Sequence, residues 1–204
     1  GRAGRAWHSE RSAGIYMSLL LRPTLSPAMA PVLTMAAGIA VRDAVAEVAG
    51  LEPDIRWPND VLVGGKKVCG ILTEMYAEPD RVKFVVCGIG INVNQTKMPE
   101  SLARIGTSLR IAAGREFSRV EIVVRLLRRF ESYYNQLIGE GAEPIIKRFA
   151  DISSYAEGKR IRVSNGKDSF VGVTAGLDPS GLLRVTRSDG RVETVLAADI
   201  SEAD

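Results

Sequence analysis

Apolar residues recur along the chain with two different periods, and the changes of period mark the expected elements. Residues 15–21 form an apolar run that ends at Arg22-Pro23 and predicts a strand. Ser26-Pro27 then offers an N-cap and a proline for the first helical turn, and Gly50 offers a stop. The apolar residues between these signals recur at helical spacing: Leu33, Ala37, Ala40, Ala44, Val45 and Val48. A long helix with one apolar face is therefore expected after the first strand.

Four apolar runs then predict strands, and glycines interrupt the two longest. The runs cover residues 54–57, 61–63, 67–76 and 82–93, and the hairpin dipeptide Gly64-Gly65 separates the second from the third. Gly70 lies inside the third run, and Gly88 and Gly90 lie inside the fourth. Glycine within a strand usually marks a close approach by a ligand or another backbone. We therefore expect these two strands to form the wall of a pocket.

A second amphipathic helix is predicted from Ser118, where Glu121 completes a capping box, to Gly139. Its apolar positions are Ile122, Leu126, Leu127, Phe130, Tyr134, Leu137 and Ile138. The arginines Arg125, Arg128 and Arg129 fall on the opposite side and are expected to be solvated. This helix is therefore expected to face the core.

After about Tyr155 the pattern changes to short strands at even spacing, separated by glycine-containing turns. These strands are predicted over residues 160–164, 169–177, 182–186 and 192–196. The expected fold class is α+β, with a mixed β-sheet backed by helices, followed by a small SH3-like β-barrel. We place the two domains at residues 1–155 and 156–204.

Composition narrows the class of protein. Of the 204 residues, 46% are hydrophobic and 25% are charged, which is typical of a soluble globular protein. The longest mostly apolar stretch, residues 28–41, contains Pro31 and is too short to span a bilayer. The formal net charge of +3 suits an anionic small molecule at least as well as a nucleic acid.

The two cysteines and the single histidine predict no metal site. Cys69 and Cys87 both lie in apolar runs without Cys-x-x-Cys spacing, so we expect buried, reduced thiols in a cytoplasmic protein. His8 has no evident partner for a catalytic triad or a metal and is expected at the surface.

Three polar segments accompany the glycine-bearing strands. Gly1, Arg2 and Arg5 belong to a Gly/Arg loop that ends at Trp7, where guanidinium groups suit phosphate or carboxylate and the indole suits an adenine. Such a loop is by itself equally typical of a disordered tail. The other segments are Trp57-Pro58-Asn59-Asp60, followed by Lys67 and Gly70, and Gly88-Ile89-Gly90-Ile91-Asn92.

With Thr107-Ser108-Leu109, these segments stand in the order found in the biotin–protein ligase family, which the chain resembles over essentially its whole length. The resemblance implies a catalytic ligase domain over residues 1–155 that uses ATP and Mg²⁺. Biotin's carboxylate would attack the α-phosphate of ATP to give biotinyl-5′-AMP and pyrophosphate. A lysine of a biotin carboxyl carrier domain would then attack this anhydride and release AMP.

The resemblance also implies roles for individual residues. The candidate catalytic residues are Lys67, Arg2 and Asp60. The candidate biotin-binding residues are Gly1, Arg2, Lys67, Gly70, Gly88, Gly90 and Ile91. The candidate ATP- and adenylate-binding residues are Arg2, Arg5, Trp7, Asn59, Lys67 and Asn92, and no fixed metal site is expected.

Several roles stay open at the level of residues. Lys67 would bridge the biotin carboxylate and the α-phosphate, where like charges require fixed cations. Lys66 is its rival, but neighbouring strand residues face opposite ways, and the family places its lysine three residues before the glycine. Asp60 would accept a proton from the attacking lysine, orient its ammonium group, or cap the turn. Asn59 and Asn92 would orient phosphate or ribose, or make ordinary turn hydrogen bonds.

The chain begins inside the Gly/Arg loop, so we expect the upstream segment that binds the biotin ring to be missing and biotin binding to be impaired. No helix-turn-helix pattern is present, so no DNA-binding role is expected, and a homodimer through sheet edges is a possibility that the family suggests. A lipoate–protein ligase is the closest alternative. Trp57-Pro58 and Gly70-Ile71-Leu72 favour biotin. A non-enzymatic nucleic-acid-binding fragment is the other, but the strands carry few aromatic residues on which bases stack.

Overall fold

The computed structural model describes residues 7–79, 81–166, 168–196 and 198–203. The larger sheet has five strands in the order β1-β5-β4-β3-β2. Its strands are β1 (Gly14–Leu21), β2 (Asp54–Arg56), β3 (Asp60–Val63), β4 (Lys66–Ala77) and β5 (Val82–Asn92). A smaller five-stranded sheet has the order β10-β6-β7-β8-β9. Its strands are β6 (Glu157–Ser164), β7 (Ser169–Leu177), β8 (Leu183–Arg187), β9 (Val192–Val195) and β10 (Asp199–Glu202).

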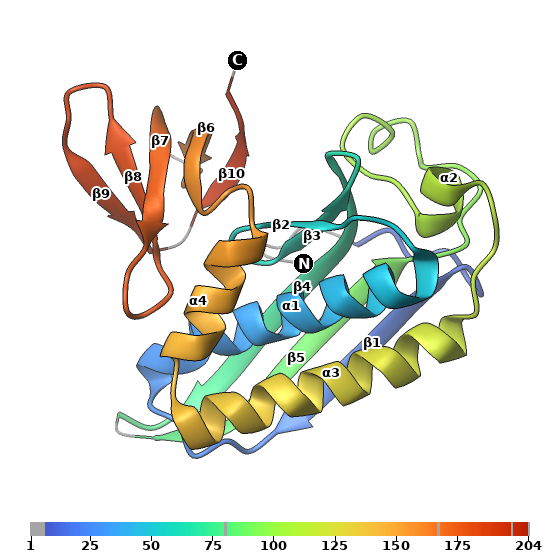
Figure 1. The fold of residues 1–204 in the computed structure, drawn as a ribbon, viewed down its shortest axis with the longest axis horizontal. Helices are drawn as coiled ribbons and strands as arrows, with labels where there is room; N and C mark the ends of the chain where they lie inside the picture. The colour runs from blue at the N-terminus through green and yellow to red at the C-terminus, as the bar shows by residue number, and fades with distance from the viewer. Residues whose placement is uncertain (1–6, 80, 167, 197, 204) are drawn as a thin grey trace.

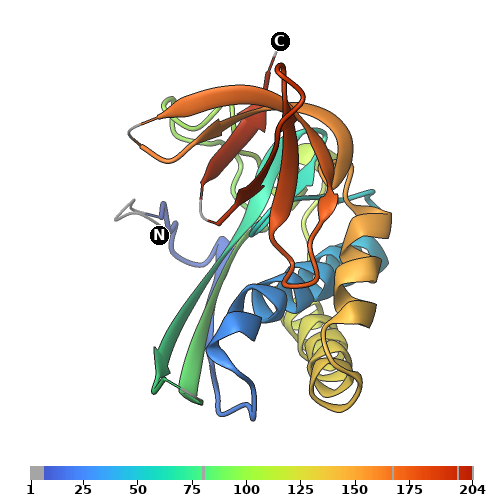
Figure 2. The same ribbon diagram turned by 90° about the vertical axis from the view of Figure 1, so that its left-hand side faces the viewer.

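The helices are η2 (Pro27–Met29), α1 (Ala30–Ala49), α2 (Leu109–Ala113), α3 (Arg119–Glu140) and α4 (Glu143–Ile152). Helices α1, α3 and α4 lie on one side of the larger sheet, and α2 lies beyond its strand ends, as Figures 1 and 2 show. Helix α1 lies between β4 and α3, and most of its side chains from Val32 to Val45 are buried. Burial on several sides explains why α1 is rich in small apolar residues, whereas α3 has a single apolar face.

The expectation of a mixed sheet is wrong, because the strand pairs of both sheets are antiparallel. Within the larger sheet, β2, β3, β4 and β5 follow one another through short connections, and such connections impose antiparallel pairing. The parallel pairing found among the described residues is an isolated bridge between Lys67 and Gly106.

The two predicted helices form, with shifted ends. A 3₁₀ turn occupies Pro27–Met29, and α1 follows it without a side-chain cap, so Ser26 is not the N-cap of α1. Gly50 ends α1 with a φ of 67°, as predicted. The Ser118 hydroxyl accepts from the Glu121 amide at 3.2 Å and begins α3. This helix continues past the predicted stop at Gly139 to Gly141, which has a φ of 89°.

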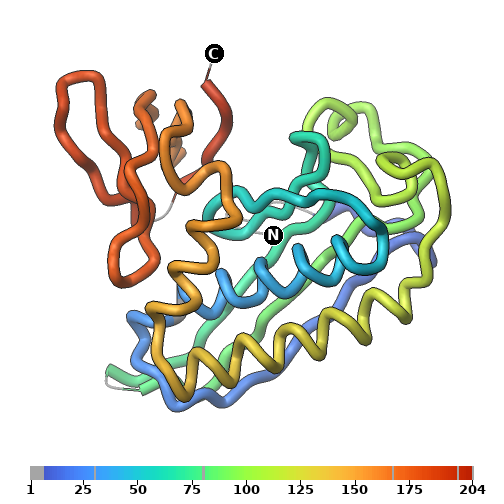
Figure 3. The backbone as a smooth tube through the Cα atoms, viewed as in Figure 1, coloured from blue at the N-terminus to red at the C-terminus, as the bar shows by residue number. Residues whose placement is uncertain are grey.

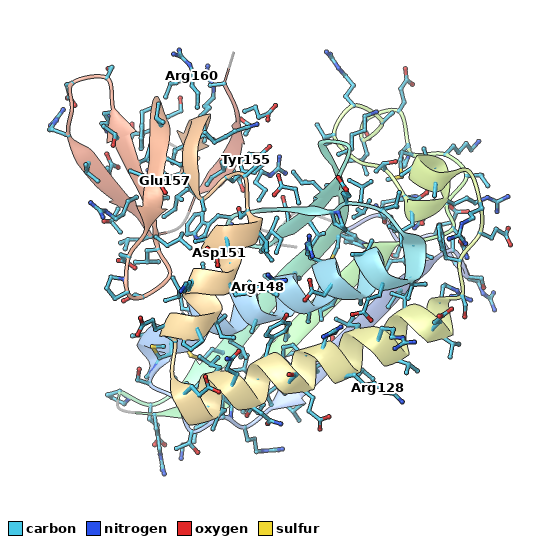
Figure 4. The ribbon with its side chains drawn as sticks, in the orientation of Figure 1. Arg128, Arg148, Asp151, Tyr155, Glu157 and Arg160 are labelled. Carbon is cyan, nitrogen blue, oxygen red and sulfur yellow. The ribbon has the colours of Figure 1, made fainter. Side chains whose placement is uncertain are left out.

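Other differences from the sequence prediction concern short elements and the apolar face of α3. Periodicity did not predict α2, α4 or β10, because each offers too few repeats of one pattern. On α3, Ile122, Leu126, Phe130 and Leu137 are buried, but Leu127 and Ile138 are 39% and 41% exposed. The three arginines expected to be solvated are exposed, and Figure 4 labels Arg128 on this helix.

The small sheet is joined to the larger domain by direct hydrogen bonds. The Trp57 indole Nε1 donates to the carbonyl of Gly181, which lies between β7 and β8, at 3.0 Å. Just before the small sheet, the Ser153 hydroxyl at the end of α4 donates to the Ile55 carbonyl at 2.6 Å and fixes the start of the connection. Buried Tyr155 lies where α4 passes into β6 (Figure 4), and Figure 3 follows the backbone through this junction. These contacts attach the small sheet beside the β2–β3 hairpin.

Candidate functional site

A cavity of about 560 Å³ lies against the larger sheet. The candidate site residues that line it are Trp7, Asn59, Asp60, Lys67, Gly70, Gly88, Gly90 and Asn92. Ala198, Asp199 and Ile200 of the small sheet and the segment before it also line it. The cavity is therefore formed by segments far apart in the sequence, including both domains that the sequence predicts.

A β-bulge places Lys67 and Gly70 together. Lys67 pairs with Leu62 and Cys69 pairs with Val61, so Val68 is an extra residue in β4. Without the bulge, residues three apart would face opposite sides of the sheet. A Cβ atom built on Gly70 would lie 2.9 Å from Lys67 Cε and 3.0 Å from Lys67 Nζ. The lysine side chain thus crosses the surface that this glycine leaves open.

Asp60 is held between two cations at the cavity wall. The Lys67 ammonium forms an ion pair with Asp60 Oδ1, and Arg56 Nη2 donates to Asp60 Oδ2 at 2.7 Å. The Lys67 side chain is 30% exposed and that of Asp60 is 14% exposed. Asp60 therefore orients the head group of Lys67, and Arg56 adds a second positive charge to the wall.

Trp7 packs on the glycine wall. Its indole would lie 2.7 Å from a Cβ atom on Gly70 and 2.7 Å from one on Gly90, closer than real side chains approach. Lys67 Nζ lies 5.4 Å from the centroid of a Trp7 ring, within the range of a cation–π contact. The absence of side chains at the two glycines therefore leaves a flat surface that accepts a planar group.

The two asparagines already have partners within the protein. Asn59 Nδ2 donates to the Ile71 carbonyl at 2.6 Å, and the Ile71 amide donates back to the Asn59 carbonyl at 3.0 Å. Asn92 Nδ2 donates to the Thr107 carbonyl at 3.0 Å. Both asparagines line the cavity, and the side chain of each donates a hydrogen bond to the backbone beside it. The alternative of ordinary hydrogen bonding to the backbone therefore describes at least part of what each asparagine does.

The Thr107-Ser108-Leu109 element lies directly behind Lys67. The Lys67 amide donates to the Ile105 carbonyl, and the Thr107 amide donates to the Lys67 carbonyl, both at 2.9 Å. Ser108 caps α2 by accepting from the Ile111 amide at 3.0 Å. Residues 105–107, distant from Lys67 in sequence, therefore fix its backbone on both sides.

Lys66 points elsewhere. Its Nζ donates to the Ala103 carbonyl at 3.0 Å, and the residue is exposed and does not line the cavity. Of the two neighbouring lysines, Lys67 is therefore the one that lines the cavity. His8 is exposed, as predicted, but it lies at the cavity rim.

The structure does not bring every candidate to the cavity. Ile91 is fully buried in the core and does not line the cavity, because alternation along β5 directs it away from the face of Gly88 and Gly90. The proposed apolar contact of Ile91 with biotin is corrected on this ground. Gly1, Arg2 and Arg5 lie outside the described residues.

Sequence analysis missed several residues of the wall. Arg56 precedes the Trp57-Pro58-Asn59-Asp60 segment and stands four residues before Asp60. Its positive charge next to this motif could therefore have indicated a second cation at the site. Tyr16 lines the cavity from β1, and Ile200 does so from the small sheet. No local pattern marks these two positions, since only the fold brings their strands to the cavity.

The thiols lie away from the cavity lining. Cys69 and Cys87 are free and buried, as predicted. Burial raises the pKa of both thiols, that of Cys87 to about 11. Neither has the lowered pKa of a reactive cysteine.

The described residues also lack two other kinds of feature. They contain no group of three or more His, Cys, Asp or Glu side chains placed to hold a metal ion. Among them, no helix combines the length and apolar character needed to cross a membrane.

Comparison with known proteins places this geometry in a family. Residues 1–92 match the model of the biotin/lipoate A/B protein ligase family. The chain is 42% identical to the bifunctional ligase/repressor BirA of Bacillus subtilis over 98% of its own length, and it spans 62% of the length of that relative. It is 36% identical to the biotin–[acetyl-CoA-carboxylase] ligase of Mycobacterium tuberculosis, with 98% of this chain and 73% of the relative covered.

A solved structure agrees along the whole chain. The biotin protein ligase from Aquifex aeolicus, in complex with biotin and ATP, superposes with a TM-score of 0.86 at 26% identity. The match covers 100% of this chain and 84% of that one. The sequence identity to the Mycobacterium relative is 36%, with 73% of that relative covered, and the fold agrees with that of the Aquifex enzyme. The chain therefore belongs to the biotin–protein ligase family.

Proposed function

We propose that the protein is an ATP-dependent ligase that forms biotinyl-5′-AMP and transfers biotin to a lysine of a biotin carboxyl carrier domain. The observation that carries this proposal is the Lys67 ammonium, held by Asp60 across the glycine wall of the cavity. The names of the relatives and the biotin and ATP of the Aquifex complex support it.

The first step demands fixed positive charge between two anions. Attack of the biotin carboxylate on the α-phosphate brings like charges together, and repulsion at a few ångströms costs several kcal/mol at an effective dielectric constant of about 20. Lys67 and Arg56 supply two cations at one wall. In the proposal, Lys67 contacts both the carboxylate and the α-phosphate, and its charge stabilises the pentavalent transition state.

For Asp60 we propose a role other than those that the sequence suggested. Because its two oxygens engage Lys67 and Arg56, we assign it to orienting these cations. Trp7 would offer its indole to the adenine, and Asn92 would orient the nucleotide from the end of β5. Arg2 and Arg5 would close over the adenylate. Gly88 would face the aliphatic chain of biotin, and Gly70 and Gly90 would do so where the Trp7 indole moves off them to meet the adenine.

We propose that Mg²⁺ accompanies ATP, where it would neutralise charge on the β- and γ-phosphates. The acidic residues among the described lining are Asp60 and Asp199. Asp60 is paired with two cations, and Asp199 also has an interaction partner. This donor set fits an ion held mainly by the substrate phosphates, which is a common arrangement for Mg²⁺.

The finer organisation is also part of the proposal. Residues 1–155 would form the catalytic domain and residues 156–204 an SH3-like barrel, with the change at Tyr155 and the antiparallel order of the small sheet in support. The partner would be the carrier domain of a biotin-dependent carboxylase in the cytoplasm. A homodimer is a further possibility that pairing at the open edge of β1 would allow.

The deciding experiment is ATP–pyrophosphate exchange with biotin and, separately, with lipoate. Exchange with biotin alone supports the proposal, whereas exchange with lipoate alone favours the related lipoate–protein ligase. A titration with biotinyl-5′-AMP and with biotin then measures each affinity. Salt-dependent binding of short RNA or DNA without exchange would overturn the enzyme assignment.

A further inference from the structure

The side chain of Gln95 is a buried amide behind the cavity wall, and the reaction proposed above gives it no role. Gln95 follows β5 and is fully buried. Its Nε2 donates to Asn92 Oδ1 at 3.3 Å and to the Tyr16 hydroxyl at 3.2 Å. Both partners line the cavity, whereas Gln95 does not. One side chain thus joins two polar groups of the wall from behind.

The hydrogen bonds around Gln95 run in one direction. Tyr16 donates its proton to the Glu10 carbonyl at 3.3 Å, so its oxygen is free to accept from Gln95. Asn92 donates through Nδ2 to the Thr107 carbonyl at 3.0 Å, so its Oδ1 must face Gln95. A carboxamide has distinct donor and acceptor ends, and a donor on one side with an acceptor on the other fixes its orientation.

Gln95 is itself held in place. The Ser108 hydroxyl donates to the Gln95 carbonyl at 2.7 Å, and Ser108 is fully buried. A buried amide is costly unless it is hydrogen-bonded, and Gln95 Oε1 has no partner among the described residues. An apolar side chain of similar volume would avoid this cost, so packing alone does not account for a glutamine here.

From these contacts we propose that Gln95 is a positioning residue, which holds the Asn92 carboxamide with Oδ1 inward so that Asn92 orients the nucleotide. This inference rests on the proposed function, because the nucleotide is its assumed ligand. Loss of the Gln95 amide would let the Asn92 carboxamide rotate. The consequence is weaker productive binding of ATP, with little effect on biotin.

The neighbouring amide provides a matched control. Asn94 Nδ2 donates to the Phe117 carbonyl at 2.9 Å, and Asn94 Oδ1 accepts from the Phe117 amide at 3.0 Å. Asn94 does not line the cavity and touches neither Asn92 nor Tyr16 through these bonds. Asn94→Leu therefore removes hydrogen bonds of a nearby loop without releasing Asn92.

The test compares Gln95→Met with Asn94→Leu in the full chain. Gln95→Met should raise the KM for ATP about tenfold and leave the KM for biotin within about twofold, the scale of one lost orienting hydrogen bond. Asn94→Leu should lower the melting temperature without this split. The double variant Gln95→Met/Asn92→Ala should be no worse than Asn92→Ala, since coupled residues are not additive.

A second readout does not depend on turnover. In ¹⁵N spectra, the Asn92 side-chain N–H protons should exchange with water about tenfold faster in Gln95→Met, because their hydrogen bond to Thr107 is no longer fixed. Asn94→Leu should leave this exchange unchanged. An unchanged exchange rate in Gln95→Met, or an equal rise of both KM values, overturns the inference. If the wild-type chain forms no adenylate, the proposed function fails, and the exchange rates alone decide the role of Gln95.

Discussion

Lys67 and Gly70 stand three residues apart on one strand, yet the lysine side chain lies across the glycine. The β-bulge at Val68 makes this possible, because it inserts one residue and turns both positions to the cavity. A side chain at residue 70 would occupy the path of the ammonium group. The motif therefore needs its lysine, its glycine and an odd spacing between them.

The first prediction separates the two neighbouring lysines. Lys67→Ala should lower the rate of adenylate formation by about two to three orders of magnitude, the scale for one well-placed electrostatic group. Lys66→Ala should have a mild effect, because Lys66 lies outside the cavity lining and its Nζ donates to the Ala103 carbonyl at the protein surface. Release of pyrophosphate measures both. Small and equal effects would contradict the assignment of Lys67.

The second prediction concerns the glycine wall. In Gly90→Ala, the new methyl group would lie 2.7 Å from Trp7 Cε2, so the indole must move. We expect about tenfold weaker binding of biotinyl-5′-AMP in calorimetry, together with a change in tryptophan emission. Gly139→Ala is the control, since its Cβ position on α3 has no atom within 4 Å apart from the adjoining residues and the local helix backbone. Unaltered binding and emission in Gly90→Ala would show that Trp7 does not pack there.

The third prediction tests the joint between the two sheets. Gly181 has a φ of 79°, and a Cβ atom there would lie 2.9 Å from Met35 Sδ. Gly190 has a φ of 82°, with no atom within 4 Å. Gly190→Ala should cost about 1 kcal/mol of unfolding free energy through backbone strain. Gly181→Ala should cost about 2–4 kcal/mol, because overpacking adds to the strain. Urea denaturation that gives equal losses would remove Gly181 from the joint.

The fourth prediction concerns pH. The pKa of the Cys87 thiol is raised by burial to about 11 in the folded protein. An unfolded thiol ionises near pH 8.5, so the unfolded state then holds fewer protons than the folded one. The contribution of Cys87 to stability is therefore complete below about pH 8.5 and is lost as the pH rises toward 11.

Cys87→Ala isolates this effect from the tyrosines, whose pKa values are also raised. Between about pH 8.5 and 10.5, the unfolding free energy of the wild type should fall more steeply than that of the variant, by up to about 1.4 kcal/mol per pH unit. Parallel curves would mean that Cys87 is not kept neutral by burial. Thiol reagents at pH 8 should modify neither cysteine until the protein unfolds.

Alternation of residues along a strand predicts only some of the side-chain directions at the site. Alternation along a strand correctly separates Lys66 from Lys67, and the same rule assigns Ile91 to the face opposite Gly88 and Gly90. Applied to residues 67 and 70, however, that rule gives the wrong face for one of them. The bulge that reverses the result depends on how β3 pairs with β4 and has no local sequence pattern.

The sequence by itself determined the long helices α1 and α3 and the Gly64-Gly65 hairpin. These features depend on contiguous periodicity and on turn chemistry, which nearby residues settle among themselves. Tertiary structure decided that Asp60 pairs with Arg56 and Lys67, that Gln95 backs Asn92, and that β10 reaches the cavity. Those relationships join segments that are separate in the chain, and only the packing of the two sheets and their loops sets the distances between them.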